Sequence, residues 1–177
     1  MVDDDILRDV ALFSNLEDRQ LTLIKGLLRE AQYSPGTRII EEGTVGVSVF
    51  IIVSGKVKIY LSFGDEQIEL TKLGPGEFFG EMSLIDDHAA VATVEAEEPT
   101  SVVTLTRADF KALLSSSTEI SEKLWESLAR DLNSKIRKTD DLVRMFYGLN
   151  KALCEDPKFR EFFSAWNFKQ AAKKNEA

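Results

Sequence analysis

The hydrophobic and polar residues follow a helical period near the start of the chain. Leu21, Ile24 and Leu28 recur at the spacing of one helix face, and a shorter apolar pattern over residues 3–13 precedes them. Asn15 is the expected N-cap of the second helix, because its side chain can accept a hydrogen bond from the first turn. The sequence therefore predicts two N-terminal helices.

The middle of the chain has a β pattern. Short runs rich in Val, Ile, Phe and Thr fill residues 37–105, and glycines separate them. This spacing predicts short strands joined by tight turns, in a barrel or jelly roll over about residues 31–106. No run is followed at once by a long helix, which argues against a doubly wound fold. The expected strands are 38–41, 49–54, 56–62, 67–73, 91–96 and 101–105.

The run 56–62 alternates most clearly. Val57, Ile59 and Leu61 occupy every second position, and Lys58 and Tyr60 lie between them. Successive side chains of a strand point to opposite faces, so this run predicts a half-buried strand. The three aliphatic residues are expected to face the interior.

After Thr106 the pattern becomes helical again, with a short helix expected over residues 107–114 and a long one from near Glu119. Apolar residues four apart drift around a helix, which predicts a broad apolar face rather than a strict heptad seam. Asp156-Pro157 either ends this helix or starts the next one, with Pro at its first position, and an extra terminal helix with an aromatic face is expected there. The apolar face packs either against the same chain or against a second copy. It comprises Ile120, Leu124, Leu128, Leu132, Ile136, Leu142, Val143, Phe146, Leu149 and Leu153.

These patterns together predict an α+β fold for the 177 residues. Its centre is a glycine-punctuated β-barrel or jelly roll, flanked by N-terminal helices, a long C-terminal helix and the extra terminal helix. Residues 1–142 are expected to form the barrel domain, and residues 143–177 a C-terminal helical extension. One domain with an appendage is also what the length suggests.

Composition excludes several classes of function. The net charge of −8 argues against broad contact with nucleic acid or with an anionic membrane, since both reward a basic face. The longest apolar run, residues 49–53, is far too short to span a bilayer. The acidic start of the chain is not a secretory signal, and a single cysteine suits a reducing compartment, so the cytoplasm is the expected location.

Catalytic chemistry has few candidate residues. Cys154 and His88 are the only residues of their types, so neither an intrachain disulfide nor a Cys/His zinc site is expected. A Ser-His-Asp or Cys-His mechanism would depend wholly on His88. We therefore expect neither an enzyme nor a metal site.

The most informative stretch is residues 74–96, the cassette segment. It contains a Gly-Pro-Gly turn, two phenylalanines, Gly80-Glu81 and a short amphipathic run over residues 82–85. A glycine that opens a one-turn helix leaves the first backbone N–H groups unpaired, so an anion can bind there. The residues that follow include Asp86 and Asp87 but no lysine or arginine. The segment thus has the frame of a phosphate site without a cation.

The order of helices, glycine-punctuated barrel, short helix and long helix resembles the cyclic nucleotide-binding domain. This is the module of catabolite activator proteins and protein kinase A regulatory subunits. The resemblance covers roughly residues 12–142. The motifs that carry it are Leu12-Phe13, Pro35-Gly36, Ile40, Glu42-Gly43, Gly46, Phe50-Ile51-Ile52, Ser54-Gly55-Lys56-Val57, the run 73–81 (LGPGEFFGE) and Ala92-Thr93-Val94.

The resemblance implies a nucleotide pocket. In the family, backbone N–H groups after the glycine at Gly80 hold the cyclic phosphate, and the glutamate at Glu81 accepts a hydrogen bond from the ribose 2′-hydroxyl. The family's Pro-Arg-Ser/Ala-Ala-Thr-Val motif aligns with residues 89–94, so Ala90 stands at the position of the arginine that clamps the phosphate. Val47 stands where the family often has an acidic residue that braces this arginine. The candidate pocket residues are Phe79, Gly80, Glu81, Met82, Ser83, Ala90 and Val91.

The missing arginine has a calculable effect. Removing one partner of a buried charge pair costs about 3–5 kcal/mol, or roughly two to four decades in affinity. The expected function is therefore a non-enzymatic regulatory module in which binding of cAMP or cGMP is lost or weakened. It would act through a protein partner or a homodimer, using the C-terminal helices from Ile120 to Trp166.

Two alternatives remain open at this point. The chain could be a working cyclic-nucleotide receptor in which another cation, from Lys56, Lys58, Lys72 or His88, replaces the arginine. The barrel could instead take a different, less anionic ligand against the apolar residues 89–91. A transcription factor is disfavoured, because residues 155–177 are too few for a helix-turn-helix domain and are not basic.

Overall fold

The computed structural model describes residues 4–64, 66–158 and 161. Contacts divide the chain into two compact units, residues 1–131 and 132–177. The first unit holds all the strands and helices α1 to α4, and the boundary falls within helix α5. Residues 157, 158 and 161 are helical, and the rest of the extra helix predicted near the C-terminus lies outside the described residues.

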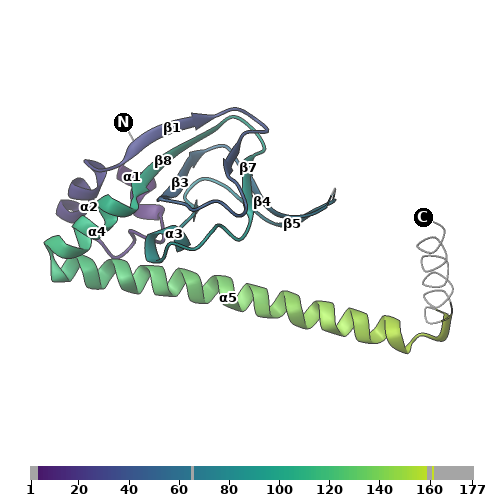
Figure 1. Ribbon diagram of the computed structural model, residues 1–177. Coiled ribbons are helices and arrows are strands. Elements are labelled where there is room, and N and C mark those ends of the chain that lie inside the picture. Colours follow the sequence, from purple (N-terminus) through teal and green to yellow (C-terminus); the bar gives the residue numbers. More distant parts are fainter. Residues whose placement is uncertain (1–3, 65, 159–160, 162–177) are drawn as a thin grey trace. The chain divides into compact units, whose positions relative to one another are not determined.

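Two four-stranded antiparallel sheets form the centre of the first unit (Figure 1). One has the strand order β1-β8-β3-β6, and the other the order β2-β7-β4-β5. This arrangement confirms the predicted α+β, jelly-roll-like fold. The strands are β1 (Arg29–Tyr33), β2 (Arg38–Ile40), β3 (Ser48–Ser54), β4 (Val57–Phe63), β5 (Glu66–Leu73), β6 (Phe78–Phe79), β7 (Thr93–Ala96) and β8 (Thr100–Thr106).

The six predicted strands are confirmed, each within two residues of its expected ends. Sequence reasoning missed β1 and β6. Strand β1 consists mostly of polar residues and pairs only with β8, so it has no apolar alternation that would mark it. Strand β6 has two residues, Phe78 and Phe79, and is defined by its pairing with β3 rather than by a pattern of its own.

The expected alternation in β4 is partly wrong. Val57 is buried as expected, but Tyr60 is also deeply buried, with 1% of its surface exposed, whereas Leu61 is only partly buried. Its hydroxyl donates a hydrogen bond to Glu95 Oε2 at 3.0 Å, and Lys58 Nζ lies 5.1 Å from the centre of its ring. A tyrosine can be buried on the outer face of a sheet when its hydroxyl has a partner and neighbouring side chains cover the ring.

The Tyr60–Glu95 contact also shifts both pKa values. Burial, followed by the hydrogen bond to Glu95, raises the pKa of Tyr60. Burial works to raise the pKa of Glu95 as well, but the hydrogen bonds from Lys58 and Tyr60 outweigh it and lower that pKa. The Lys58 ammonium lies 2.9 Å from Glu95 Oε1. The second sheet thus carries a compact polar cluster on one face.

The helices follow the predicted order with corrected ends. The second helix begins at Asp18 rather than after an Asn15 cap, because Glu17 and Gln20 form a capping box in which Glu17 N donates to Gln20 Oε1 at 3.0 Å. The long helix ends at Glu155, directly before Asp156-Pro157 as predicted. The helices are α1 (Asp4–Asp9), α2 (Asp18–Lys25), α3 (Met82–Ile85), α4 (Arg107–Ser116) and α5 (Thr118–Glu155).

The first turns of α5 pack within the first unit. Leu124 and Leu128 are fully buried, and Trp125 lies edge-to-face on Phe110 of α4, with ring centres 6.1 Å apart. Lys123 Nζ hydrogen-bonds Glu17 and Gln20 at the start of α2 at 3.2 Å. This part of the predicted apolar face therefore contributes to the core.

The later apolar residues of α5 are exposed. From Ile136 to Leu149, each has more than half of its surface accessible. Among the residues that the structure describes, no helix combines the length and apolar character needed to cross a bilayer. The exposed residues are Ile136, Leu142, Val143, Met145, Phe146, Tyr147 and Leu149.

Candidate functional site

The cassette segment is anchored on β3 by two aromatic rings. Phe79 of β6 pairs with Phe50 of β3, and the rings stack at 5.1 Å with 5° between their planes. Gly80 follows with φ +80°, in the left-handed region. A Cβ at Gly80 would lie 2.9 Å from the Ser48 carbonyl oxygen and 3.2 Å from Ile40 Cδ1. Both the conformation and the space require glycine here.

Helix α3 begins at Met82, and Glu81 between it and this glycine is the N-cap. Ser83 N donates to the Gly80 carbonyl at 3.1 Å, and Leu84 N to the Glu81 carbonyl at 2.9 Å. The N–H groups that precede Ser83 have no acceptor within the helix, as at any helix start. Glu81 is 7% exposed, whereas Met82 is 48% exposed. The predicted sequence of glycine, glutamate and short helix is therefore present as a structural unit.

The loop before β3 supports both halves of the predicted site. A Cβ at Gly46 would fall 2.1 Å from Ser83 Oγ, so the loop lies directly against α3. On the other side, Gly43 N donates to the Ala90 carbonyl and Ala90 N donates to the Thr44 carbonyl, both at 2.8 Å. These contacts connect the residues around Ser83 and those around Ala90 to one loop.

The backbone at the arginine position is thus held in place. Ala90 uses both its N–H and its carbonyl in the bonds to Thr44 and Gly43. Thr93 is buried, and its hydroxyl accepts a hydrogen bond from Glu42 N at 3.1 Å. Val91 is 64% exposed. Position 90 therefore has a fixed backbone and presents only a methyl group.

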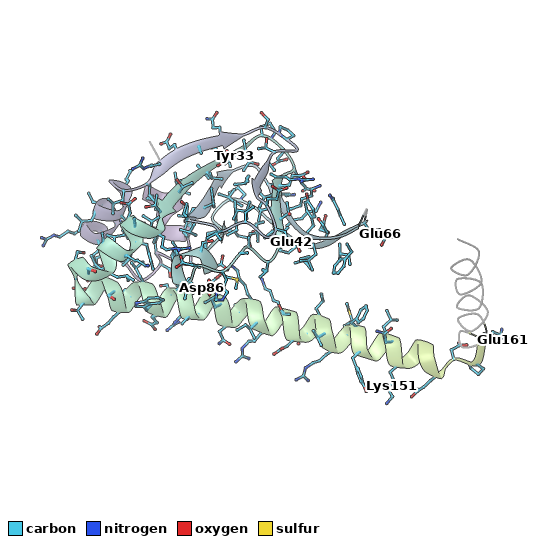
Figure 2. All side chains as sticks on the ribbon, viewed as in Figure 1. Tyr33, Glu42, Glu66, Asp86, Lys151 and Glu161 are labelled. Atoms are coloured by element: carbon cyan, nitrogen blue, oxygen red, sulfur yellow. The ribbon has the colours of Figure 1, made fainter. Side chains whose placement is uncertain are left out.

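The charged groups near α3 are mostly acidic. Asp86 directly follows α3 (Figure 2). His88 donates its backbone N–H to Asp86 Oδ1 at 3.1 Å, and its Nδ1 lies 3.1 Å from Oδ2. The backbone hydrogen bond first, and then the side-chain bond, lowers the pKa of Asp86. His88 itself is 88% exposed, so it forms a surface pair with Asp86.

Two of the candidate substitute cations are engaged elsewhere. Lys58 pairs with Glu95 in the polar cluster of the second sheet. Lys72 pairs with Glu97 and lies 3.6 Å from Glu69 Oε2. The structure assigns both lysines to carboxylates on the strands rather than to α3.

A cation that sequence reasoning missed contacts the cassette segment at Ser83 and Asp87. Arg107, the first residue of α4, donates to the Ser83 carbonyl and, at 2.7 Å, to the Gly46 carbonyl. It also forms an ion pair with Asp87, and its side chain is 13% exposed. Arg107 follows the cassette segment by more than ten residues, and no local motif marks it. Only the pairing of β8 with β3 brings it close.

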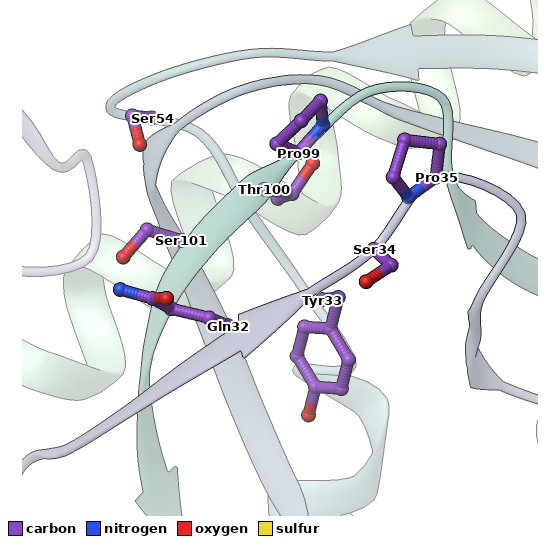
Figure 3. Close-up of a pocket in the computed structure, with 8 residues that line it drawn as sticks. All are labelled: Gln32, Tyr33, Ser34, Pro35, Ser54, Pro99, Thr100 and Ser101. Carbon is purple, nitrogen blue, oxygen red and sulfur yellow. The ribbon is translucent and has the colours of Figure 1, made fainter.

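Two surface hollows are lined by residues other than the predicted pocket residues. One has a volume of about 520 Å³ and is polar and open (Figure 3). The other, of about 350 Å³, lies beside Arg107 and Val47. Neither is lined by Gly80 or Glu81. The lining residues in Figure 3 are Gln32, Tyr33, Ser34, Pro35, Ser54, Pro99, Thr100 and Ser101.

A family model and similar known proteins point to the same family. The model of the cyclic nucleotide-binding domain matches residues 30–117. The chain is 32% identical over 149 residues to the cyclic AMP receptor protein of Thermus thermophilus, covering 80% of this chain and 69% of that protein. It is 33% identical over 111 residues to a cAMP-dependent protein kinase regulatory subunit of Colletotrichum orbiculare, covering 63% of this chain and 28% of that protein.

A solved structure agrees with these relatives. The Thermus thermophilus catabolite activator protein superposes with a TM-score of 0.69 and 30% identity, over 77% of this chain and 63% of that one. The chain belongs to the cyclic nucleotide-binding domain family, and it is a regulatory or sensor domain of that family. It spans about two thirds of the bacterial relative and under a third of the kinase subunit.

Proposed function

We propose that this chain is a cytoplasmic, non-enzymatic regulatory module in which cyclic-nucleotide binding is lost or strongly weakened. One observation carries the proposal. Ala90 aligns with the arginine of the family's motif, and its backbone is hydrogen-bonded to Gly43 and Thr44. The module then acts through protein contacts of α5 rather than by responding strongly to cAMP or cGMP.

The electrostatics of the site support weak binding. A phosphate beside α3 would find backbone N–H groups but no guanidinium fork, which supplies two parallel charge-assisted bonds. Arg107 is engaged by carbonyls and by Asp87, and Glu81 and Asp86 add negative charge nearby. The absent pairing corresponds to about 3–5 kcal/mol, or roughly two to four decades in affinity.

Titration calorimetry with cAMP and with cGMP tests this proposal. The wild-type chain is expected to bind both more weakly than a low micromolar dissociation constant. Ala90→Arg is expected to bind at least about tenfold more tightly than wild type, because it restores the fork. Leu23→Arg is the matched control, since it adds the same charge at an exposed position of α2, outside the candidate pocket residues. A low micromolar or tighter constant for the wild type would refute the proposal.

For the protein contacts, we propose that α5 pairs with a second copy of the chain. The apolar face of α5 is broader than a strict heptad seam, but two heptad series run within it. Ile136, Val143 and Asn150 recur every seven residues, and Leu132, Thr139 and Phe146 form the second series. β-Branched residues and one asparagine in the first series are typical of parallel two-stranded coiled coils. Lys135 and Asp140 occupy the flanking positions that meet across such a pair. The exposure of Ile136, Val143 and Phe146 is consistent with this surface being covered in a dimer.

Sedimentation velocity over a range of concentrations tests the dimer. Wild-type chain is expected to sediment as a dimer, and Val143→Lys as a monomer, because the charge would be buried in the seam. Asp141→Lys adds the same side chain on the opposite side of the helix and is expected to remain dimeric. A monomeric wild-type chain would exclude the homodimer and leave another protein as the partner.

A further inference from the structure

Arg107 joins the start of α4 to two segments that are distant from it in sequence, the loop at Gly46-Val47 and the cassette segment. Its backbone N–H donates to the Val47 carbonyl at 2.8 Å, which continues the pairing of β8 with β3. Its side chain donates through Nη2 to Gly46 and through Nε to Ser83, and Nη1 pairs with Asp87. Each nitrogen of the guanidinium therefore has a different partner.

Arginine is the residue that this arrangement needs. A guanidinium presents its N–H groups in a rigid planar fork, whereas a lysine ammonium is a compact point charge. Bonds from a charged donor to carbonyls are stronger than neutral ones, and more so where water is excluded. Arg107 is 13% exposed and its partner Ser83 is 7% exposed, so this bond lies in such a setting.

Arg107 also lies on α4, the helix that packs on α5. Arg107 is the first residue of α4, and α3 contacts α4. Phe110, one turn later, packs edge-to-face on Trp125 of α5. A change in the position of α3 therefore acts on α4 through the Arg107 side chain.

We infer that Arg107 is a positioning residue that holds α3 on α4, and that Asp87 supplies the anion for this contact from within the chain. The cassette segment is thereby kept in place without a bound ligand. The inference concerns the position of α3, so it stands whether or not the proposed loss of nucleotide binding is correct. It differs from a general contribution to stability because it predicts a local effect.

Hydrogen exchange of the full chain measures that local effect. In Arg107→Gln, the amides of Ser83 and Leu84 are expected to exchange about 10- to 100-fold faster, the factor that corresponds to losing one hydrogen bond from a charged group. The amides of Ile51 and Val103, which lie in the paired strands β3 and β8, are expected to exchange as in wild type. A merely structural role would instead accelerate both sets together.

Two further variants complete the experiment. Arg130→Gln is the matched control, because Arg130 is 74% exposed and pairs only along its own helix with Glu126 in the contacts described. It is expected to leave Ser83 and Leu84 unchanged. Arg107→Lys keeps the charge without the fork and is expected to accelerate the same amides, and it replaces the glutamine variant if that one does not fold. Unchanged exchange at Ser83 and Leu84 in the Arg107 variants overturns the inference.

A binding measurement separates this inference from the proposed function. Where Ala90→Arg gains cAMP affinity, adding Arg107→Gln is expected to remove about tenfold or more of the gain, and adding Arg130→Gln none of it. Failure of Ala90→Arg to gain affinity counts against the proposed function alone. Retention of the full gain in Ala90→Arg/Arg107→Gln counts against Arg107 as the positioning residue.

Discussion

Gly80→Ala is a stringent test of how the cassette segment is built. Gly80 has φ +80°, and a Cβ there would lie 2.9 Å from the carbonyl oxygen of Ser48. That oxygen belongs to β3, where Ser48 pairs with Thr106 of β8, so it has little freedom to move. Ile40 Cδ1 and Phe50 Cδ2 would lie at 3.2 and 3.3 Å. The added methyl group therefore meets backbone on one side and packed side chains on the other.

The expected loss of stability has two parts. The left-handed backbone costs a residue with a Cβ about 1–2 kcal/mol, and crowding in a packed interior costs about 1–3 kcal/mol more. Gly80→Ala should therefore lower the free energy of unfolding by about 2–5 kcal/mol. Gly36 has the same φ of +80° but nothing within 4 Å, so Gly36→Ala should lose only the first part. Gly74 has neither feature, and Gly74→Ala should change stability by less than about 0.5 kcal/mol.

Urea unfolding followed by circular dichroism measures all three variants on one scale. The midpoint should fall in the order Gly74→Ala, Gly36→Ala, Gly80→Ala, with the slope unchanged, since the surface exposed on unfolding is the same. Equal losses for Gly80→Ala and Gly36→Ala would refute the argument from crowding. If Gly80→Ala and Gly36→Ala lose no more stability than Gly74→Ala, the argument from backbone conformation is refuted.

Other predictions follow from single contacts. Tyr60→Phe should lower the free energy of unfolding, measured by urea unfolding, by about 1.5–3 kcal/mol, because it removes a hydrogen bond to the charged Glu95. No loss would show that this hydrogen bond does not stabilise the fold. Burial raises the pKa of Tyr60, so its absorbance should titrate at a higher pH than that of a free tyrosine. Because the folded pKa is the higher one, the stability that this group contributes should be lost as pH rises through it, less so in Tyr60→Phe. Leu124→Ala should cost about 2–5 kcal/mol in thermal unfolding, and a loss under 1 would contradict its complete burial. Gly148→Ala should raise helical stability by about 0.5–1 kcal/mol, since nothing lies within 4 Å of its added Cβ and α5 is helical there; a lower melting temperature would contradict this.

Much of the fold was predictable because its signals are local. Strand runs and the glycines between them mark turns over a few residues, and the six predicted strands are present. The frame of the cassette segment was equally visible, since the glycine at Gly80 and the short helix after it adjoin in sequence. The absence of an arginine at Ala90 is likewise a fact of the sequence, and the structure adds that its backbone is held by Gly43 and Thr44.

Other features could not be predicted because they depend on which strands meet. The burial of Tyr60 requires Lys58 on its own strand and Glu95 on β7, whereas the alternation of apolar residues in β4 indicated that this face of the strand is exposed. Strand β1 exists through its pairing with β8, since its own residues are mostly polar. A short run of residues specifies a conformation, whereas its burial depends on neighbours from elsewhere in the chain.

The sequence by itself determined the class of fold, the position of the cassette segment and the methyl group at Ala90, because each is written in adjacent residues. Only the tertiary structure decided which part of α5 is core, with Leu128 buried and Ile136 exposed on one apolar face. It also placed Arg107 behind α3, against Gly46, Ser83 and Asp87. Electrostatic interactions depend on distance in space and not on separation in sequence. Arg107 follows the cassette segment by more than ten residues, but the pairing of β8 with β3 brings it into contact with that segment.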